Sequence, residues 1–396
     1  MKFITKIFMT KKLLITISVL LFLGCSDHNT DLYQDVSIEL LETIEVDYQG
    51  VLTLVDFNSE KGFLLAVDQN PLNNVILLLN LKGEILSKFD NRIPGENNFK
   101  GKLNSISFDK NGEGYWIVSY SGLYKYNSDW KLIDFYENHD LNGSKYWNTD
   151  LKHFFVTNKS DTSQFYLYTL LNAEKTNLNN ENPNYYKQVK HLTSFDSKNR
   201  KFKLDAGFEK NSIYLNNEFR FPPYFVFFEK SSDDQSIILS YSHEPSIYTY
   251  KIGENGQLKF YEKTGLELDY FDISVKTPFG SEIDFNKSSF DSRITSILNY
   301  KEYTYVTYLK SINQNDFFSS GNSFDNQAQF ENYLMKNYHY VLHILKDGKK
   351  YCEDIILPQH LYNPIVALSE DTIIFQPSRA FYENENETFF ILKLKL

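Results

Sequence analysis

Four short apolar runs decide the fold: VLTLVDF at 51–57, GFLLAVD at 62–68, VILLLNL at 75–81 and EILSKF at 84–89. The tetrapeptide Asn58-Ser59-Glu60-Lys61 separates the first two runs, and Lys82-Gly83 separates the last two. Asn, Ser and Gly are residues that tight turns favour. Because each run has the length of one strand and is bounded by turn residues, the stretch predicts a four-stranded antiparallel meander.

The same arrangement of short apolar runs and turns recurs along the rest of the chain. The further predicted strands are 103–108, 115–119, 123–126 and 131–136; 152–157, 164–170, 189–194 and 200–205; 224–229, 236–242, 247–252 and 257–261; 294–298, 303–309, 338–345 and 350–357; and 365–369, 372–376 and 388–396. Six such meanders are typical of propeller blades, so the sequence predicts an all-β, six-bladed β-propeller. A seven-bladed ring and a two-domain all-β protein that includes a β-sandwich stay open as alternatives.

The sixth meander has only three predicted strands, whereas the segment 37–47 has no place in the first one. We expect this N-terminal segment to complete the last blade and close the ring, which removes exposed strand edges. The propeller domain is therefore predicted to span 37–396. Its one predicted helix is 327–336, in which Phe330, Tyr333 and Leu334 form an apolar stripe.

The first 25 residues carry the features of a bacterial export signal. Four lysines precede an apolar run at 13–23, which ends at Gly24-Cys25. The run is about half the length of a membrane-spanning helix, but it fits a secretory signal. Residues 21–25 resemble a lipobox, so we predict a signal peptide at 1–24, lipidation of Cys25 and a tether over 25–36. A plain secretory signal with a chance cysteine is the alternative, and either Met1 or Met9 is the start.

Lipidation of Cys25 has consequences for location and for cysteine pairing. Two or more acyl chains anchor a protein stably, so we expect attachment to the bacterial cell envelope, at the outer membrane, on its periplasmic or surface face. The second cysteine, Cys352, then has no partner for an intramolecular disulfide. The net charge of −10 argues against nucleic acid as a partner, because such binding needs a positive surface.

The chain resembles the six-bladed propeller lipoproteins of Bacteroidetes, a TolB-like propeller group whose functions are mostly unknown. The resemblance rests on Gly24-Cys25, on the blade pattern, and on the segments FPPYF at 221–225 and PSIYTY at 245–250. It covers nearly the whole chain after the signal. It implies a propeller held by a lipid anchor, and it supplies no catalytic residue.

The long connections between the predicted strands indicate which face binds a ligand. In a four-stranded blade, the turns after the first and third strands lie on one face, and all other connections lie on the opposite face. The six longest connections all belong to that opposite face: 90–102, 137–151, 171–188, 206–223, 262–293 and 310–337. Long loops are often functional, so we predict one loop-rich binding face. Drift on an unconstrained rim is the alternative.

Four of the five arginines fall on, or at the ends of, connections of this same predicted face, and so does His243. The candidate ligand-binding residues are Arg92, Arg220, His243, Arg293 and Arg379. Arginine recognises carboxylate and phosphate with two parallel hydrogen bonds, so an arginine-lined mouth would suit an anionic ligand. The alternative is that these residues form ordinary surface ion pairs.

The sequence contains no recognisable catalytic motif, metal-ligand cluster or cofactor fingerprint. Two function classes stay open. The first is a binding or scaffold module that engages a glycan, a peptide or a partner protein through the loop-rich face. The second is a metal-dependent hydrolase of the propeller lactonase type, with a metal ion on the ring axis. A structural or signalling role inside a larger envelope complex is a third hypothesis.

Overall fold

The structure, a computed structural model, describes residues 36–70, 74–137, 152–158, 160–161, 164–170, 181–216, 218–222, 224–274, 276–379 and 386–396. The predicted signal peptide at 1–24 and the predicted lipidation site Cys25 lie outside the described residues. Among the described residues, no helix has the length and the apolar character needed to span a bilayer.

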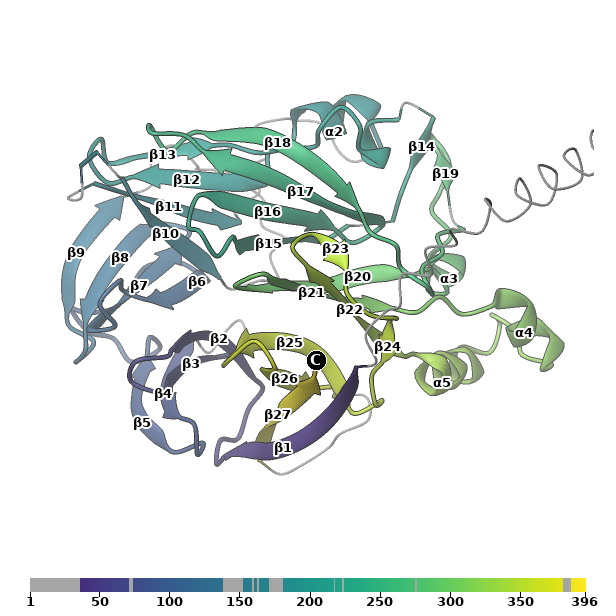
Figure 1. Cartoon of the computed structure of the whole chain (residues 1–396), viewed down its shortest axis with the longest axis horizontal. Helices are drawn as coiled ribbons and strands as arrows, with labels where there is room; N and C mark the ends of the chain where they lie inside the picture. Colours follow the sequence, from purple (N-terminus) through teal and green to yellow (C-terminus); the bar gives the residue numbers. More distant parts are fainter. Residues whose placement is uncertain are drawn as a thin grey trace, which may run out of the picture. The chain divides into compact units, whose positions relative to one another are not determined.

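Six antiparallel sheets are arranged in a ring, which is a six-bladed β-propeller (Figure 1). Blade one contains β2 (Leu52–Asn58), β3 (Phe63–Asp68), β4 (Val75–Asn80) and β5 (Ile85–Asp90); blade two, β6 (Leu103–Phe108), β7 (Gly114–Ser119), β8 (Gly122–Asn127) and β9 (Leu132–Glu137); blade three, β10 (His153–Thr157), β11 (Phe165–Leu170), β12 (Leu192–Asp196) and β13 (Lys201–Leu204). Blade four contains β15 (Val226–Lys230), β16 (Ser236–Tyr241), β17 (Glu244–Ile252) and β18 (Leu258–Gly265); blade five, β20 (Arg293–Tyr300), β21 (Tyr303–Leu309), β22 (Tyr340–Lys346), β23 (Lys349–Lys350) and β24 (Ile355–Ile356); blade six, β25 (Leu361–Ala367), β26 (Thr372–Pro377), β27 (Glu387–Lys395) and β1 (Ser37–Val46). The predicted fold class is confirmed.

The N-terminal strand closes the ring as predicted. β1 pairs antiparallel with β27, from Ser37 opposite Lys395 to Val46 opposite Glu387. It therefore forms the outer strand of the last blade, beside the C-terminal strand (Figure 1). The inner strand of blade one, β2, contacts the inner strands of blades two and six, so the first and last blades meet.

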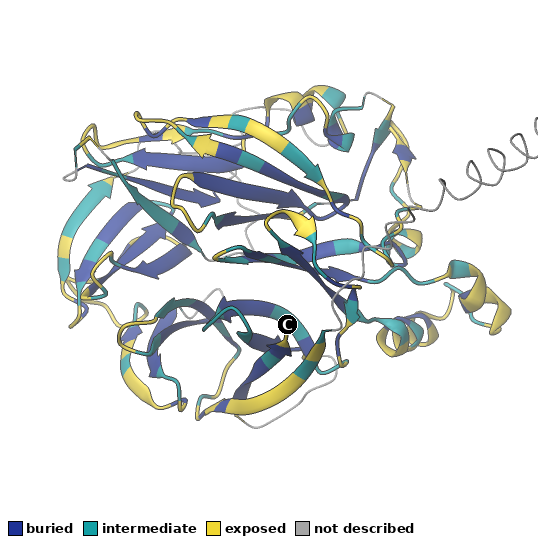
Figure 2. Ribbon diagram, in the orientation of Figure 1, coloured by how far each residue is buried: buried dark blue, intermediate teal, exposed yellow. Residues whose placement is uncertain are grey.

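The hydrophobic core lies mainly between neighbouring blades, and the second strand of each blade is almost entirely buried (Figure 2). One cluster joins the first and last blades and includes Ile44, Leu54, Leu77 and Ile374. Aromatic side chains fill much of the rest, as at the stacked pair Phe89 of blade one and Trp130 of blade two, whose ring centroids are 5.2 Å apart. The high aromatic content of the chain thus reflects packing between blades.

The outer strand of blade five differs from the prediction. A continuous strand over 350–357 was expected, but β23 and β24 are separate two-residue strands. Between them the Asp354 carboxylate turns inward and accepts hydrogen bonds from His343 Nδ1, at 2.6 Å, and from the Tyr308 hydroxyl. The strand is interrupted because this buried carboxylate needs hydrogen-bond donors. The alternation of apolar and polar residues along a strand does not reveal such a need.

The helices also extend beyond the prediction. The expected helix is present as α5 (Gln327–Asn337), but the expectation of a single helix was wrong. Three short helices were missed: α2 (Pro183–Gln188), α3 (Phe285–Ser288) and α4 (Gln314–Ser319). Each is too short for an apolar period, although each begins after an Asn or Asp whose side chain caps a backbone N–H. Because α2 ends at Gln188, β12 starts three residues later than predicted.

Candidate functional site

The long connections start and end on one face of the ring, as the predicted order of the strands requires. Every sheet is antiparallel and runs from the axis outward, so the ends of all six connections emerge on the same face. Residues 138–151 and 171–180 within them lie outside the described part. Two of these connections pair directly, through β14 (Phe219–Arg220) and β19 (Thr277–Pro278). Blade five carries α4 and α5 in its long connection, and they extend outward from the ring (Figure 1).

Two cavities lie on the axis. The loop-end cavity, of about 510 Å³, lies between the first residues of the inner strands, including Thr53, Arg293 and Tyr362. The turn-end cavity, of about 670 Å³, lies between the last residues of those strands, including Phe57 and Asn299. Both volumes fall in the range of small-molecule sites.

Polar contacts near the axis bridge neighbouring blades at every junction; the bridge from blade six starts at Arg379, in the connection after β26. In order from blade one, the bridges are Phe108 N–H to Asp56 Oδ2, 2.8 Å; His153 with Ser105 Oγ and Ser107 Oγ, 2.9 and 2.7 Å; Lys152 Nζ to Glu229, 3.1 Å; Asn299 Nδ2 to Lys230 O, 3.2 Å; Thr295 Oγ1 to Asn363 Oδ1, 2.8 Å; and Arg379 Nη2 to Leu52 O, 3.3 Å. Polar residues near the axis therefore have a structural role first. A site for a charged ligand must therefore use side chains whose charge these bridges do not neutralise.

Arg293 is such a group at the loop end. It is the first residue of β20 and lines the loop-end cavity. Among the residues that the structure describes, no carboxylate forms an ion pair with it. Its neighbours are aromatic: burial raises the pKa of Tyr338, Tyr340 and Tyr362, and the nearby positive charge of Arg293 partly opposes this. The partly exposed guanidinium thus lies beside buried tyrosine side chains.

His243 lies close to Arg293, between β16 and β17. The side chain is buried, and Nδ1 is 3.2 Å from Ser242 Oγ. Burial, together with a smaller effect of the charge of Arg293, lowers the pKa of His243 to about 4. The imidazole is therefore neutral at pH 7, and Arg293 provides the positive charge in this part of the site.

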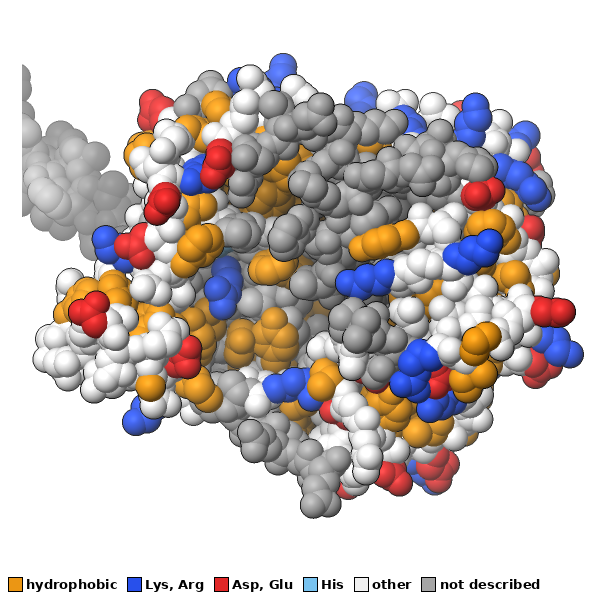
Figure 3. All heavy atoms as spheres, turned by 180° about the vertical axis from the view of Figure 1, so that it is seen from behind, with side chains coloured by type: hydrophobic (Ala, Val, Ile, Leu, Met, Phe, Trp, Pro, Cys, Tyr) orange, Lys and Arg blue, Asp and Glu red, His pale blue; other side chains and the backbone are white. Residues whose placement is uncertain are grey.

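The loop-end cavity as a whole favours a negative ligand. The charged side chains among its described lining residues are Arg293 and Lys152; both are cationic, and Lys152 is already paired with Glu229, so the unpaired charge is that of Arg293. The remaining lining is aromatic, aliphatic or neutral polar, and Phe225 is 39% exposed at its edge. Ser296 also lines it, and its buried hydroxyl has no hydrogen-bond partner within the described residues. Figure 3 shows the molecule from behind Figure 1, with Lys, Arg and hydrophobic side chains close together around the centre of that face.

The structure does not gather the five predicted ligand-binding residues at one mouth. Arg92 is exposed, and its Nε donates to Asp90 at 2.7 Å. Arg379 forms a two-pronged ion pair with Glu387, at 3.0 and 2.7 Å. Arg220 is buried in β14, donates to the Ser281 carbonyl and lies 3.5 Å from Glu181. Arg293 and His243 do lie together, and the ligand-binding role of all five stays a prediction.

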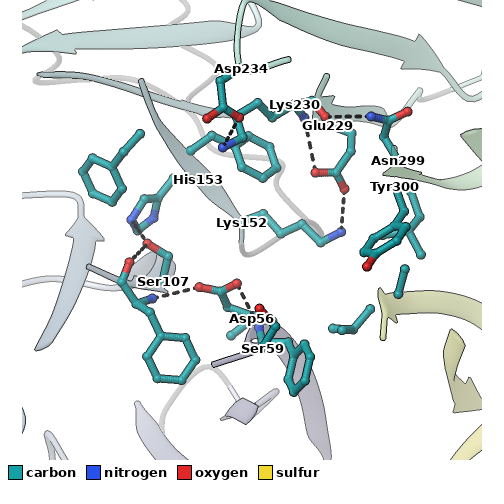
Figure 4. Close-up of a pocket in the computed structure, with 18 of the residues that line it drawn as sticks. Asp56, Ser59, Ser107, Lys152, His153, Glu229, Lys230, Asp234, Asn299 and Tyr300 are labelled. Carbon is teal, nitrogen blue, oxygen red and sulfur yellow. Dashed lines mark hydrogen bonds and ion pairs between the residues drawn. The ribbon is translucent and has the colours of Figure 1, made fainter. Parts of the chain in front are cut away.

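Sequence reasoning missed three charged residues on the axis. Asp56, Lys152 and Glu229 converge at the turn-end cavity from β2, from the residue before β10, and from β15 (Figure 4). In the sequence, Asp56 and Glu229 lie near the ends of the predicted strands 51–57 and 224–229. Their position in an inner strand was the available signal, because all inner strands face the axis. Over the described ranges, no group of three or more His, Cys, Asp or Glu residues is arranged to hold a metal ion.

Comparisons with known proteins bear on the fold. No protein-family model matches the chain, and a sequence search of curated proteins finds no match. A member of the DUF4221 family from Bacteroides vulgatus is similar in structure, with a TM-score of 0.63 and 11% identity over 91% of this chain and 99% of that one. The chain shares its fold. A putative exported protein from Bacteroides fragilis gives a TM-score of 0.49 and 12% identity over 94% of this chain and 97% of that one. The predicted likeness to propellers of Bacteroidetes is thus confirmed at the level of the fold.

Proposed function

We propose that this protein is a lipid-anchored binding module of the cell envelope that holds an anionic ligand in the loop-end cavity. Arg293 is the anchor for the ligand. The observation that carries the proposal is the position of its guanidinium, at a cavity lined by cationic but no acidic side chains, with no carboxylate partner in the described structure. A partly buried cation without a counter-ion gains from binding an anion that supplies one.

The ligand is expected to combine an anionic group with a body that packs on rings. The carboxylate or phosphate would pair with Arg293 through two parallel hydrogen bonds. Phe225 and Tyr362 offer apolar surface for a sugar ring or a peptide side chain. An acidic glycan and an acidic peptide both meet this description.

The location rests on the N-terminal sequence. The basic start, the short apolar run and Gly24-Cys25 support export and lipidation at Cys25. Such a protein would be attached to a membrane through its acyl chains. Metabolic labelling with a clickable fatty acid tests this directly, and a Cys25→Ser variant should lose the label.

The ligand proposal is tested by titration calorimetry on the mature chain. Matched pairs of probes isolate the charge: glucuronate against glucose, and an acidic peptide against its fully amidated form. Binding of at least one acidic probe should exceed that of its neutral counterpart by about tenfold or more, because charge-assisted hydrogen bonds contribute about 1.5–3 kcal/mol. The Arg293→Gln variant should lose this preference, whereas Arg200→Gln, an exposed arginine that lines neither cavity, should keep it.

A further inference from the structure

The opposite end of the axis carries the opposite charge, at Asp56. This residue lies in β2 and lines the turn-end cavity, where Figure 4 shows its carboxylate among the charged residues of the wall. One carboxylate oxygen accepts the N–H of Phe57 and the other accepts the N–H of Phe108, both at 2.8 Å. Within the described part of the chain, no Lys, Arg or His forms an ion pair with Asp56. Backbone amides bind the carboxylate, but they do not neutralise it.

The charges around Asp56 leave a negative excess. Lys152 is paired with Glu229 at 3.1 Å, and both side chains are largely buried. The deep part of the wall therefore holds two carboxylates and one ammonium group. Lys110, Asp233 and Asp234 also line the cavity, but they are exposed, so solvent screens them. Lys230 is paired with Asp234 at 2.7 Å.

The proton affinity of Asp56 agrees with this excess. Burial raises the pKa of its carboxyl to about 6, although the two backbone hydrogen bonds and the charge of Lys152 oppose the rise, while Glu229 adds to it. His153 supplies no positive charge, because burial lowers its pKa to about 3. Asp56 thus lies at the cavity wall, and its ionised carboxylate lacks a counter-ion.

Aromatic rings complete the site. Phe57, Phe155 and Tyr300 line the turn-end cavity and are only partly buried. Organic cations are attracted to the faces of such rings, and the attraction is strongest where the cation is desolvated. A carboxylate without a counter-ion beside half-buried aromatic rings is the combination that recognises ammonium groups.

We propose that the turn-end cavity is a second ligand site, which binds a small organic cation by pairing its primary ammonium group with Asp56. An amino sugar and a lysine side chain both carry this group. The site differs in place and in charge from the loop-end cavity, so the inference stands independently of the proposed function. The protein would then bind unlike groups at the two ends of one axis, with the Lys152–Glu229 pair between them.

The test is titration of the mature chain at pH 7.5 with the two sources of the cation. Glucosamine is compared with N-acetylglucosamine, and Nα-acetyl-lysine amide with its Nε-acetylated form. At least one cation should bind about tenfold or more tightly than its neutral counterpart. The Asp56→Asn variant should lose that preference, whereas Asp129→Asn, an exposed carboxylate that does not line the cavity, and Arg293→Gln, at the other end of the axis, should keep it.

The pH dependence of cation binding by the wild-type protein tests the proposal without any substitution, so the test still holds where Asp56→Asn fails to fold. Lowering the pH of the wild-type protein from 7.5 to 5 should weaken cation binding by about tenfold, because Asp56 is then mostly protonated. The proposal is overturned if neither cation binds more tightly than about 1 mM. It is also overturned if the neutral analogues bind equally well, or if a folded Asp56→Asn protein keeps the cation preference.

Discussion

Closure of the ring by β1 predicts a large effect from one side chain in that strand. Ile44 is fully buried and packs in the cluster that joins the first and last blades, with Leu54 and Phe389 among its members. Truncation to Ala removes buried methyl groups and leaves a cavity, which costs about 2–5 kcal/mol for an Ile to Ala change in a core. Because the cluster holds blade six to blade one, the loss should lower the stability of the whole ring.

The matched control is in the same strand. Leu40 is 53% exposed on β1, so Leu40→Ala should change the free energy of unfolding by no more than about 0.5 kcal/mol. Urea denaturation of both variants, followed by tryptophan fluorescence, makes the comparison. Equal stabilities of Ile44→Ala and wild type would refute closure through β1. A separate early transition in which only β1 detaches would show that the strand is an accessory to a ring that is already stable.

Three further predictions concern buried groups. Glu244→Ala should lower the free energy of unfolding, measured by urea denaturation, by about 3–5 kcal/mol, because Ser212, Tyr248 and Lys263 all donate to this carboxylate. The control Glu262→Ala, at an exposed carboxylate, should have little effect. A loss below about 1 kcal/mol for Glu244→Ala would contradict this role. The Cys352 thiol is buried, and burial raises its pKa to about 11. Iodoacetamide should therefore label this thiol at pH 8 only after the protein is unfolded. Labelling of the folded protein would contradict this prediction. The pKa of Asp56 is about 6 in the folded protein and 3.8 without burial, so ionisation of this carboxyl favours the unfolded chain. The free energy of unfolding should therefore fall by about 1–3 kcal/mol as the pH rises from 4 to 6. Asp56→Asn should remove that fall when urea denaturation is repeated across this pH range. A variant with the same pH dependence as wild type would contradict the assignment.

The strands could be predicted because their signals are local. The runs of blade one, the turn at Lys82-Gly83 and the unplaced segment before blade one all depend on neighbours in sequence, and the structure reproduces them to within one or two residues. The ring followed from counting these meanders. The alternative of seven blades disappeared because β1 supplies the strand missing from the sixth blade.

The site could not be predicted to the same depth because it depends on contacts between blades. Nothing near Lys152 in the sequence indicates Glu229, and the two meet only because their inner strands are neighbours in the ring. Arg293 and Arg92 looked alike in sequence, as arginines on long connections. Arg293 reaches the axis because it begins an inner strand, while Arg92 follows the outer strand β5 and pairs with Asp90. The position of each arginine within its blade is therefore the sequence feature that distinguishes Arg293 from Arg92.

The central claim is that Arg293 gives the loop-end cavity a preference for negative ligands. The most direct measurement is the ratio of affinities for an acidic probe and its neutral counterpart, obtained by calorimetry on the wild-type protein and on Arg293→Gln. The account predicts a ratio of about ten or more in the wild type and a ratio near one in the variant. Ratios near one in both proteins for every probe pair, or an unchanged preference in the variant, would contradict it.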